Sequence, residues 1–414
     1  MAENFITNIF AENSRNVKDL EIPLSNDCRM HLILTGKNGS GKTSLLLEIN
    51  KFLTQIDNGN FRYFSDYKNA QSSLEKQLSA PDINTEQKPR LESELKTLKE
   101  CLLQFGGVNI KFSGNEHTLV DKCQKGEFLL AFFDAKRPAT NLTIPKGLDK
   151  IHLQKKYGLN DKANACFIQY IVNFKADRSF AKDDNETEVV EKIDKWFERL
   201  ENRLKQIFDA DTLELRFDRK SYNFDIIING QAPFNFNNLS DGYSAIISIV
   251  TELLLRMEAH EAKSYDLEGI VVIDEIETHL HVGLQKKVLP FLTDFFPKIQ
   301  FLVTTHSPFV LSSLSNAVIC DLETRIVTTD LSAYSYDVLL ESYFNIDKYS
   351  EEIKNKIIEF DQLTSLPEKT GEQAEQIKVL KDYFANTPKS KYLAPELLVK
   401  LQQIELNELN NKKQ

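Results

Sequence analysis

A glycine-rich loop that contains two lysines is the first candidate for chemistry. Residues 36–43 read Gly-Lys-Asn-Gly-Ser-Gly-Lys-Thr and match the pattern G-x-x-x-x-G-K-[ST] in full. Such glycines let backbone N–H groups curl around phosphates, and the positive end of a following helix adds to the attraction. Lys42 can then reach the β and γ phosphates, and the Thr43 hydroxyl can ligate Mg2+. The expected phosphate-binding residues are Asn38, Gly39, Ser40, Gly41, Lys42, Thr43 and Ser44.

Two carboxylates follow an apolar run much later in the chain. Residues 270–273 are Ile-Val-Val-Ile, and Asp274 and Glu275 come directly after them. Ligands of parallel sheets sit at the C-terminal ends of the strands, where these two side chains would emerge. We expect Asp274 to hold Mg2+ through its water shell and Glu275 to polarise a water that attacks the γ phosphate. An apolar strand followed by two acidic residues is common on its own. Together with the glycine-rich loop it is a strong indication of a nucleotide-hydrolysing site.

The elements around these residues alternate between strand and helix, which predicts an α/β fold with a mostly parallel core sheet. Buried strands are expected at 31–36, 128–138, 269–275 and 299–307, and helices at 44–53, 239–259 and 280–296. A polar segment from 65 to 103 carries Leu91, Leu95, Leu98 and Leu102 at helical spacing, which predicts an inserted helical hairpin. An amphipathic helix over 186–208 and two strands near 213–230 follow.

Two further motifs narrow the family. Asn238-Leu239-Ser240-Asp241-Gly242-Tyr243, directly before a helix, resembles the signature motif of ABC-type ATPases. Thr304-Thr305-His306-Ser307, at the end of the next strand, resembles their switch histidine. Because all four motifs occur in the order of that family, the chain resembles an ABC-type P-loop ATPase. The resemblance covers residues 1 to about 330 and implies an ABC-type head with an N-terminal antiparallel β lobe.

The spacing and one local motif point to a branch of that family. Lys42 and Asp274 lie 232 residues apart, and the added length falls where relatives of SMC proteins insert their arms. The segment Asp274 to His281 reads DEIETHLH, similar to the SMC-like and OLD-like (AAA_21-type) ATPases. In layout the chain looks most like the ATPase subunits of bacterial anti-phage systems, such as Septu PtuA and the PARIS ATPase.

The resemblance implies a mechanism that needs two copies of the chain. Ser240 and Gly242 of one copy would contact the γ phosphate of ATP held by the loop of the other, so a homodimer or higher homo-oligomer is expected. Lys42, Glu275 and His306 are the expected catalytic residues, Thr43 and Asp274 the expected metal ligands, and ATP and Mg2+ the cofactors. A separate effector, such as a nuclease of the HNH or Toprim type, is the expected partner, and nucleic acid is a further one.

Several residues keep more than one interpretation. His279 and His281 are either metal ligands or, by the resemblance, part of a dimer-facing loop. Lys136 and Arg137 could contact phosphate, contact the opposite protomer, or serve only their loop. Gln71 and Gln55 are candidates for a Mg2+-sensing glutamine by their order alone, and a surface role suits each of them equally.

The expected division of the chain has five parts. They are the first half of the head with the phosphate loop (1–64), the inserted hairpin (65–104), a middle β/α part (105–237), the second half of the head with the other motifs (238–330), and a helical C-terminal region (331–414).

Composition limits the remaining possibilities. The net charge of -10 argues against nonspecific nucleic-acid binding, although short basic stretches exist at 146–156 and 216–220. Five scattered cysteines suggest neither a disulfide framework nor a zinc site. No run approaches the roughly 18 apolar residues that span a bilayer, and no signal peptide is visible, so a cytoplasmic protein without membrane contact is expected. The alternatives are an SMC-like ATPase of DNA repair or maintenance and a self-contained nuclease of the overcoming-lysogenisation type.

Overall fold

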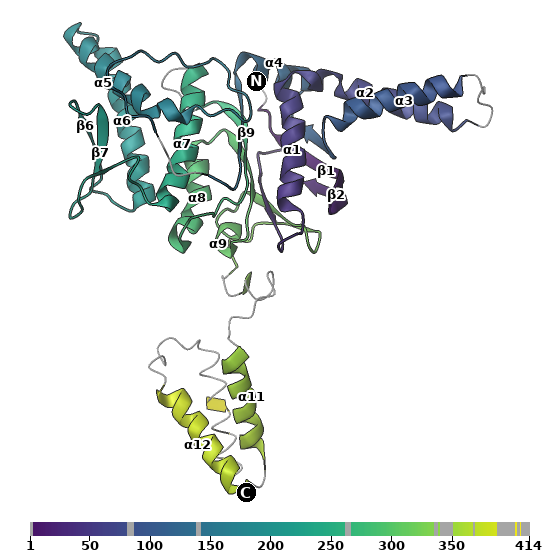
Figure 1. Cartoon of the computed structure of the whole chain (residues 1–414), viewed down its shortest axis with the longest axis vertical. Coiled ribbons are helices and arrows are strands. Elements are labelled where there is room, and N and C mark those ends of the chain that lie inside the picture. Colours follow the sequence, from purple (N-terminus) through teal and green to yellow (C-terminus); the bar gives the residue numbers. More distant parts are fainter. Residues whose placement is uncertain are drawn as a thin grey trace. The chain divides into compact units, whose positions relative to one another are not determined.

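The computed structural model describes residues 3–80, 87–137, 142–260, 266–334, 338–339, 351–366, 369–386, 402–403 and 406. The chain divides into two compact units, Met1–Tyr336 and Asp337–Gln414 (Figure 1). This division falls a few residues beyond the expected boundary at residue 330. No helix in the described ranges is long and apolar enough to cross a membrane.

A six-stranded sheet forms the centre of the first unit. Its order is β12-β11-β3-β10-β9-β5, and every neighbouring pair is parallel except β11 and β12. The mostly parallel core sheet that the sequence predicts is therefore confirmed. The strands are β3 (His31–Thr35), β5 (Phe128–Phe133), β9 (Glu268–Ile273), β10 (Ile299–Thr304), β11 (Ala317–Asp321) and β12 (Ile326–Thr329).

Helices cover this sheet on both faces, which explains why its central strands are mostly apolar. Every residue of β3 and β10 is buried. Helix α1 (Lys42–Asp57) packs its buried residues into one apolar cluster with alternate residues of the strands, such as Leu32 and Leu302. Figure 1 shows α7 (Asp241–His260) and α8 (Val282–Phe295) on the opposite side of β9 from α1.

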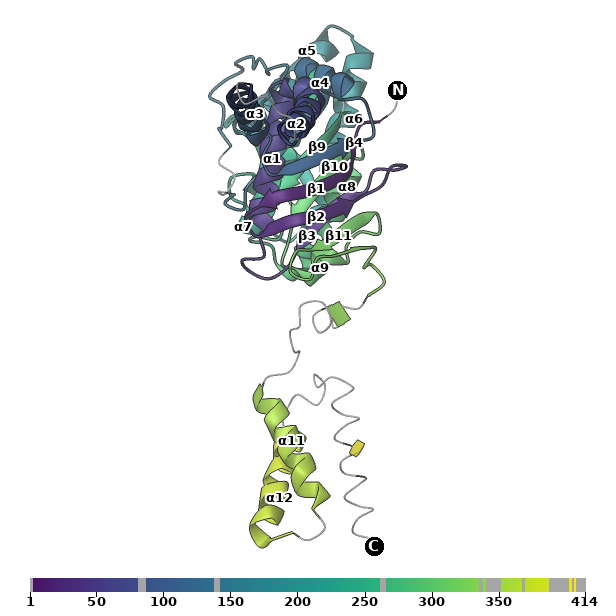
Figure 2. The ribbon, with the colours of Figure 1, turned by 90° about the vertical axis from the view of Figure 1, so that its right-hand side faces the viewer.

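The N-terminal strands form a separate antiparallel sheet, as the resemblance implies. Its order is β2-β1-β4, from β1 (Ile6–Ser14), β2 (Val17–Pro23) and β4 (Val108–Phe112) (Figure 2). The inserted hairpin consists of α2 (Phe64–Leu78) and α3 (Lys88–Leu103). Phe64 is the only residue of these two helices that is fully buried, so the hairpin extends from the head. Residues 81–86, between these two helices, lie outside the described part of the chain.

The rest of the first unit contains elements that the sequence analysis found and others that it missed. The expected helix is α6 (Thr187–Phe208), and the expected strands are β6 (Glu214–Asp218) and β7 (Asn223–Ile227), which pair with the short β8 (Phe234–Asn235). The missed elements are α4 (Glu116–Lys125), α5 (Phe167–Asp183), the short α9 (Pro308–Leu311), the 3-10 helices η1 (Asn60–Tyr63) and η2 (Asn164–Cys166), strand β11 and the edge strand β12.

The second unit is helical in its described part, as expected. It contains α11 (Glu351–Ser365) and α12 (Gly371–Asn386). Ile357, Phe360, Ile377 and Leu380 form a small apolar core between them.

The free energy of unfolding of the first unit should depend on pH through His31, the first residue of β3. Its imidazole is buried, and Nδ1 accepts the Phe301 N–H at 3.1 Å. Burial and the nearby Arg29 lower the pKa of His31 to about 4, so the folded protein holds a neutral ring. An unfolded histidine titrates near 6.5, so the stabilisation is complete above that pH and is lost as the pH falls toward 4.

We expect the free energy of unfolding of the wild type to fall by about 2 kcal/mol more than that of His31→Gln between pH 7 and pH 5. A glutamine can accept the same N–H without titrating. Urea unfolding at the two pH values measures this difference. Equal losses in the two proteins would contradict the assignment.

Candidate active site

The glycine-rich loop connects β3 to α1, in the strand-loop-helix order that phosphate binding needs. Gly36, Gly39 and Gly41 have φ values of 131°, 85° and 104°, a region that favours glycine. A Cβ on Gly36 would lie 2.8 Å from the Ser40 Oγ. No side chain caps the start of α1, so its first N–H groups are available to an anion.

Side chains in this loop also fit phosphate groups. The Ser40 Oγ is buried and has no hydrogen-bond partner. The Lys42 Nζ donates to the carbonyl oxygens of Gly36 at 2.7 Å and Lys37 at 3.1 Å. Burial lowers the pKa of Lys42, while the carboxylates of Glu275 and other acidic residues oppose that shift. A donor without a partner and an ammonium group at an uncapped helix start suit the oxygens of a nucleotide.

Asp274 contacts the first turn after this loop, although it lies 232 residues after Lys42 in the sequence. It follows β9, is almost fully buried, and its Oδ1 accepts the Thr304 hydroxyl at 2.5 Å. The Thr43 hydroxyl donates to the same oxygen at 3.3 Å. The two residues predicted to bind Mg2+ are therefore in contact, and hard oxygen donors of this kind are those that Mg2+ prefers.

Glu275 adopts a backbone conformation that is uncommon for glutamate. Its φ is 45°, in the left-handed region, which costs a residue other than glycine about 1–2 kcal/mol. Surrounding contacts hold this conformation. The Glu275 N–H donates to the Thr304 Oγ1 at 2.7 Å, and its Oε2 accepts the Thr278 hydroxyl at 3.2 Å. Strain of this kind is found where a catalytic side chain must point in one direction.

Arg137, which follows β5, contacts the backbone of the same turn. Its Nη1 donates to the carbonyl oxygen of Asp274 at 2.9 Å, and its Nη2 donates to that of Glu275 at 2.6 Å. The side chain is buried, and this burial lowers its pKa, while Glu277 and other carboxylates oppose the shift. Neighbouring Lys136 is exposed.

Glu277, which was not among the residues predicted from the sequence, contacts the switch-histidine segment. The His306 N–H donates to the Glu277 Oε1 at 2.5 Å, and the Glu277 Oε2 is buried without a partner. Burial and the charge of Lys42 lower the pKa of His306, while Glu277 and Glu275 oppose the shift. The signal was present in the sequence as a third acidic residue in Asp-Glu-Ile-Glu.

The signature motif lies apart from the phosphate loop of its own chain. Ser240 is exposed just before α7, and Gly242 packs so closely that a Cβ would lie 2.9 Å from the carbonyl oxygen of His279. Within the described residues, no hydrogen bond or ion pair joins Ser240 or Gly242 to residues 36–43. The structure therefore brings Lys42, Thr43, Asp274, Glu275 and His306 together and leaves Ser240 facing solvent.

The remaining candidates are placed as follows. Asn38 is exposed in the loop, and Ser44 is half-buried in the first turn of α1. Gln71 lies on the inserted hairpin and donates to Glu75, while Gln55 accepts from Asn60 near the end of α1. His279 is exposed, and His281 precedes α8. No group of three or more metal-binding side chains occurs among the residues that the structure describes.

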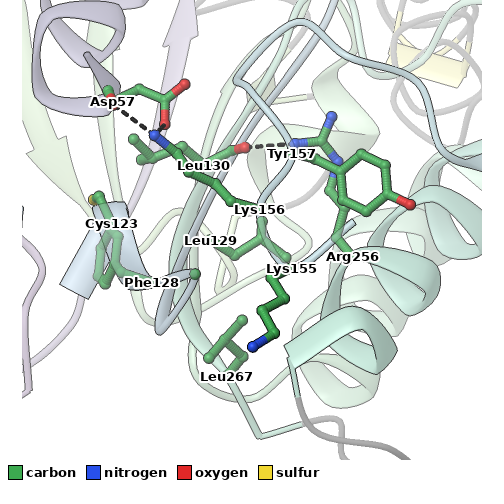
Figure 3. A pocket seen from close by; sticks show the side chains of 11 residues that line it. Asp57, Cys123, Phe128, Leu129, Leu130, Lys155, Lys156, Tyr157, Arg256 and Leu267 are labelled. Carbon is green, nitrogen blue, oxygen red and sulfur yellow. Dashed lines mark hydrogen bonds and ion pairs between the residues drawn. The ribbon is translucent and has the colours of Figure 1, made fainter. Parts of the chain in front are cut away.

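A small pocket of about 20 Å³ lies away from these residues and is lined by charged side chains that contact one another (Figure 3). The Lys156 Nζ pairs with Asp57 at 2.8 Å, and Arg256 donates to the carbonyl oxygens of Leu130 at 2.8 Å and Gly158 at 3.0 Å. Arg256 also pairs with Glu252 at 2.7 Å, and both side chains are buried. These polar groups are therefore paired with one another. Their contacts hold α1 and α7 against β5 and the segment that contains Lys156 and Gly158.

Comparisons with known proteins agree with the motifs. Residues 160–312 match the family described as "AAA domain, putative AbiEii toxin, Type IV TA system". The chain is 34% identical over 154 residues to the Septu protein PtuA of Bacillus mycoides, covering 35% of this chain and 22% of that protein. It is 30% identical over 220 residues to the Septu protein PtuA of Bacillus thuringiensis, covering 40% of this chain and 55% of that protein.

A further relative is the "Retron Ec83 probable ATPase" of Escherichia coli, which is 37% identical over 94 residues. That match covers 22% of this chain and 17% of the relative. In these matches the chain spans at most about half of the relatives' length. The motifs, the fold and these similarities are those of an ABC-type P-loop ATPase head, and the chain is similar to Septu proteins PtuA and to a retron probable ATPase.

Proposed function

We propose that the chain binds Mg-ATP between two copies of itself, hydrolyses it, and so switches an anti-phage defence complex in the cytoplasm. One observation carries the chemical part of this proposal. The phosphate loop, the Asp274 carboxylate, the strained turn at Glu275 and the His306 segment converge at the C-terminal ends of β3, β9 and β10. Open parallel sheets bind their ligands at this edge.

Each residue has a definite task in the proposed reaction. The loop and Lys42 bind and orient the β and γ phosphates, and the Thr43 and Asp274 oxygens hold Mg2+, which neutralises charge that develops on the phosphates. Glu275 accepts a proton from the attacking water, and His306 contacts the γ phosphate. Ser240 lies outside its own site, which supports a role for it and Gly242 at the site of a second copy.

The biological part of the proposal rests on similarity. The relatives include two Septu proteins and a retron ATPase, so we assign the chain to a defence system in which a separate effector protein, such as a nuclease, performs the output. Closing and opening of the ATPase dimer would move any partner protein that is bound to the α2–α3 hairpin or to the C-terminal helices.

The test is ATP turnover per protomer over a range of protein concentrations, with light scattering in Mg-ATP. We expect turnover per protomer to rise with concentration and to reach a plateau where the dimer predominates. Turnover per protomer that stays constant from nanomolar to micromolar protein, with a monomer at every concentration, would contradict a shared site. Incubation of the chain alone with DNA forms part of the same experiment, and DNA cleavage by it would favour the self-contained nuclease instead.

A further inference from the structure

We infer that Arg137 is a positioning residue for hydrolysis, which holds the Glu275 turn in its catalytic shape through the backbone. This inference rests on the proposed ATPase function. It differs from the roles that the sequence left open, because the shortest contacts of the guanidinium are to the turn after β9, with a longer one at 3.4 Å to the carbonyl oxygen of Asp134 in its own loop.

The geometry explains why an arginine is suited to this place. A guanidinium presents its N–H donors in a rigid planar fork, which matches two neighbouring acceptors. Here the two terminal nitrogens reach two successive carbonyl oxygens, those of Asp274 and Glu275. Both belong to the point where β9 ends and the chain turns, beyond the strand pairing of β9. The Glu275 oxygen also accepts the Thr278 N–H at 3.0 Å, so Arg137 adds a second donor there.

The turn needs such support because its conformation is strained. Glu275 has a positive φ, and the contact at 2.6 Å between Arg137 and its carbonyl oxygen fixes the peptide group that follows its Cα. The Glu275 N–H is fixed on the other side by Thr304. With both flanking peptide groups held, the direction of the Glu275 side chain is set, and a displacement of about 1 Å at such a group can lower a rate about 100-fold.

The contacts of Arg137 argue against a role in binding phosphate or a second copy. Both of its terminal nitrogens donate to carbonyl oxygens of the chain's own backbone, and the side chain is 8% exposed. Its Nε is buried without a hydrogen-bond partner. A residue that acts only through the turn should change the rate of the chemical step and leave ATP affinity unchanged.

The experiment compares Arg137→Ala and Arg137→Lys with the wild type. We expect kcat to fall about 10- to 100-fold in Arg137→Ala, with the ATP dissociation constant unchanged within about twofold. Lysine cannot donate to both carbonyl oxygens in the same way, so Arg137→Lys should also be slow. Millimolar guanidinium should restore part of the rate of Arg137→Ala by occupying the vacated space.

Arg29→Ala is the matched control. Arg29 also uses its terminal nitrogens on a carbonyl oxygen, that of Pro297, and on Glu3, and its Nε is likewise buried without a partner. Guanidinium should leave the rate of this variant unchanged. Wild-type kcat in Arg137→Ala, or weaker ATP binding as its main defect, would overturn the inference.

Hydrogen exchange of the nucleotide-free protein separates this inference from the proposed function. We expect the amides of residues 274–278 to exchange faster in Arg137→Ala than in the wild type, whether or not the wild type hydrolyses ATP. A wild type that does not hydrolyse ATP would contradict the proposed function. Unchanged exchange of these amides in Arg137→Ala would contradict the positioning role of Arg137.

Discussion

Replacing Glu275 by glutamine is expected to lower ATP turnover by at least about 100-fold, because an amide cannot accept the proton of the attacking water. The change keeps the size of the side chain and its acceptor for the Thr278 hydroxyl. The backbone contacts from Thr304 and Arg137 do not involve the carboxylate, so the turn should keep its shape. ATP binding should therefore be retained, and the protein should accumulate in its ATP-bound dimer.

Steady-state turnover, the affinity for a fluorescent ATP analogue and light scattering measure these three quantities. Glu94→Gln, on the inserted hairpin, is the control, because Glu94 is exposed and pairs with Arg90 on the same helix, away from the motifs. A Glu275→Gln protein that retains more than about a tenth of the wild-type rate would show that another group activates the water.

The second large effect is the loss of ATP turnover in two variants, Lys42→Ala and Ser240→Arg, each for a different reason. Lys42→Ala removes the buried ammonium group of the phosphate loop, and charge-assisted contacts of this kind contribute about 1.5–3 kcal/mol each. We expect it to bind ATP at least about 10-fold more weakly and to hydrolyse almost none. Ser240→Arg leaves the loop intact and places a large cation on the exposed signature motif, so it should bind ATP normally but fail to close the dimer.

Ser179→Arg is the control for the second variant, since Ser179 is also exposed on a helix of the first unit and lies outside the motifs. It should keep the wild-type rate. Loss of ATP binding in Ser240→Arg would contradict the placement of the signature motif away from its own loop.

The motifs of the site could be found from sequence because each has fixed local spacing. The glycine-rich loop specifies its own strand-loop-helix geometry, and an apolar strand followed by Asp274 and Glu275 specifies a sheet edge. Contacts between motifs could not be predicted in this way, because they depend on which strands become neighbours in the sheet. Thr43 meets Asp274 only because β3 and β9 flank β10, an order that no local pattern contains.

Arg137 and Glu277 show where sequence reasoning stops. Arg137 was one of two basic residues after a strand, and only the pairing of β5 with β9 shows that it reaches the turn beyond Ile273. Glu277 follows Glu275 by two residues, yet the left-handed conformation at Glu275 turns the chain so that Glu277 contacts the His306 segment. Helix α5 was missed although Phe167, Ile168, Ile171 and Val172 recur at helical spacing, because an apolar residue such as Phe180 also lies on its exposed side.

The central claim, that each ATP lies between two copies of the chain, is tested most directly by mixing Lys42→Ala with Ser240→Arg. A mixed dimer contains one site with an intact loop from one copy and an intact signature motif from the other. If copies exchange freely, a 1:1 mixture should regain about a quarter of the wild-type turnover, because half of the dimers are mixed and each has one complete site. A mixture as inactive as its two components, although co-purification of differently tagged copies shows that mixed dimers form, would contradict the account.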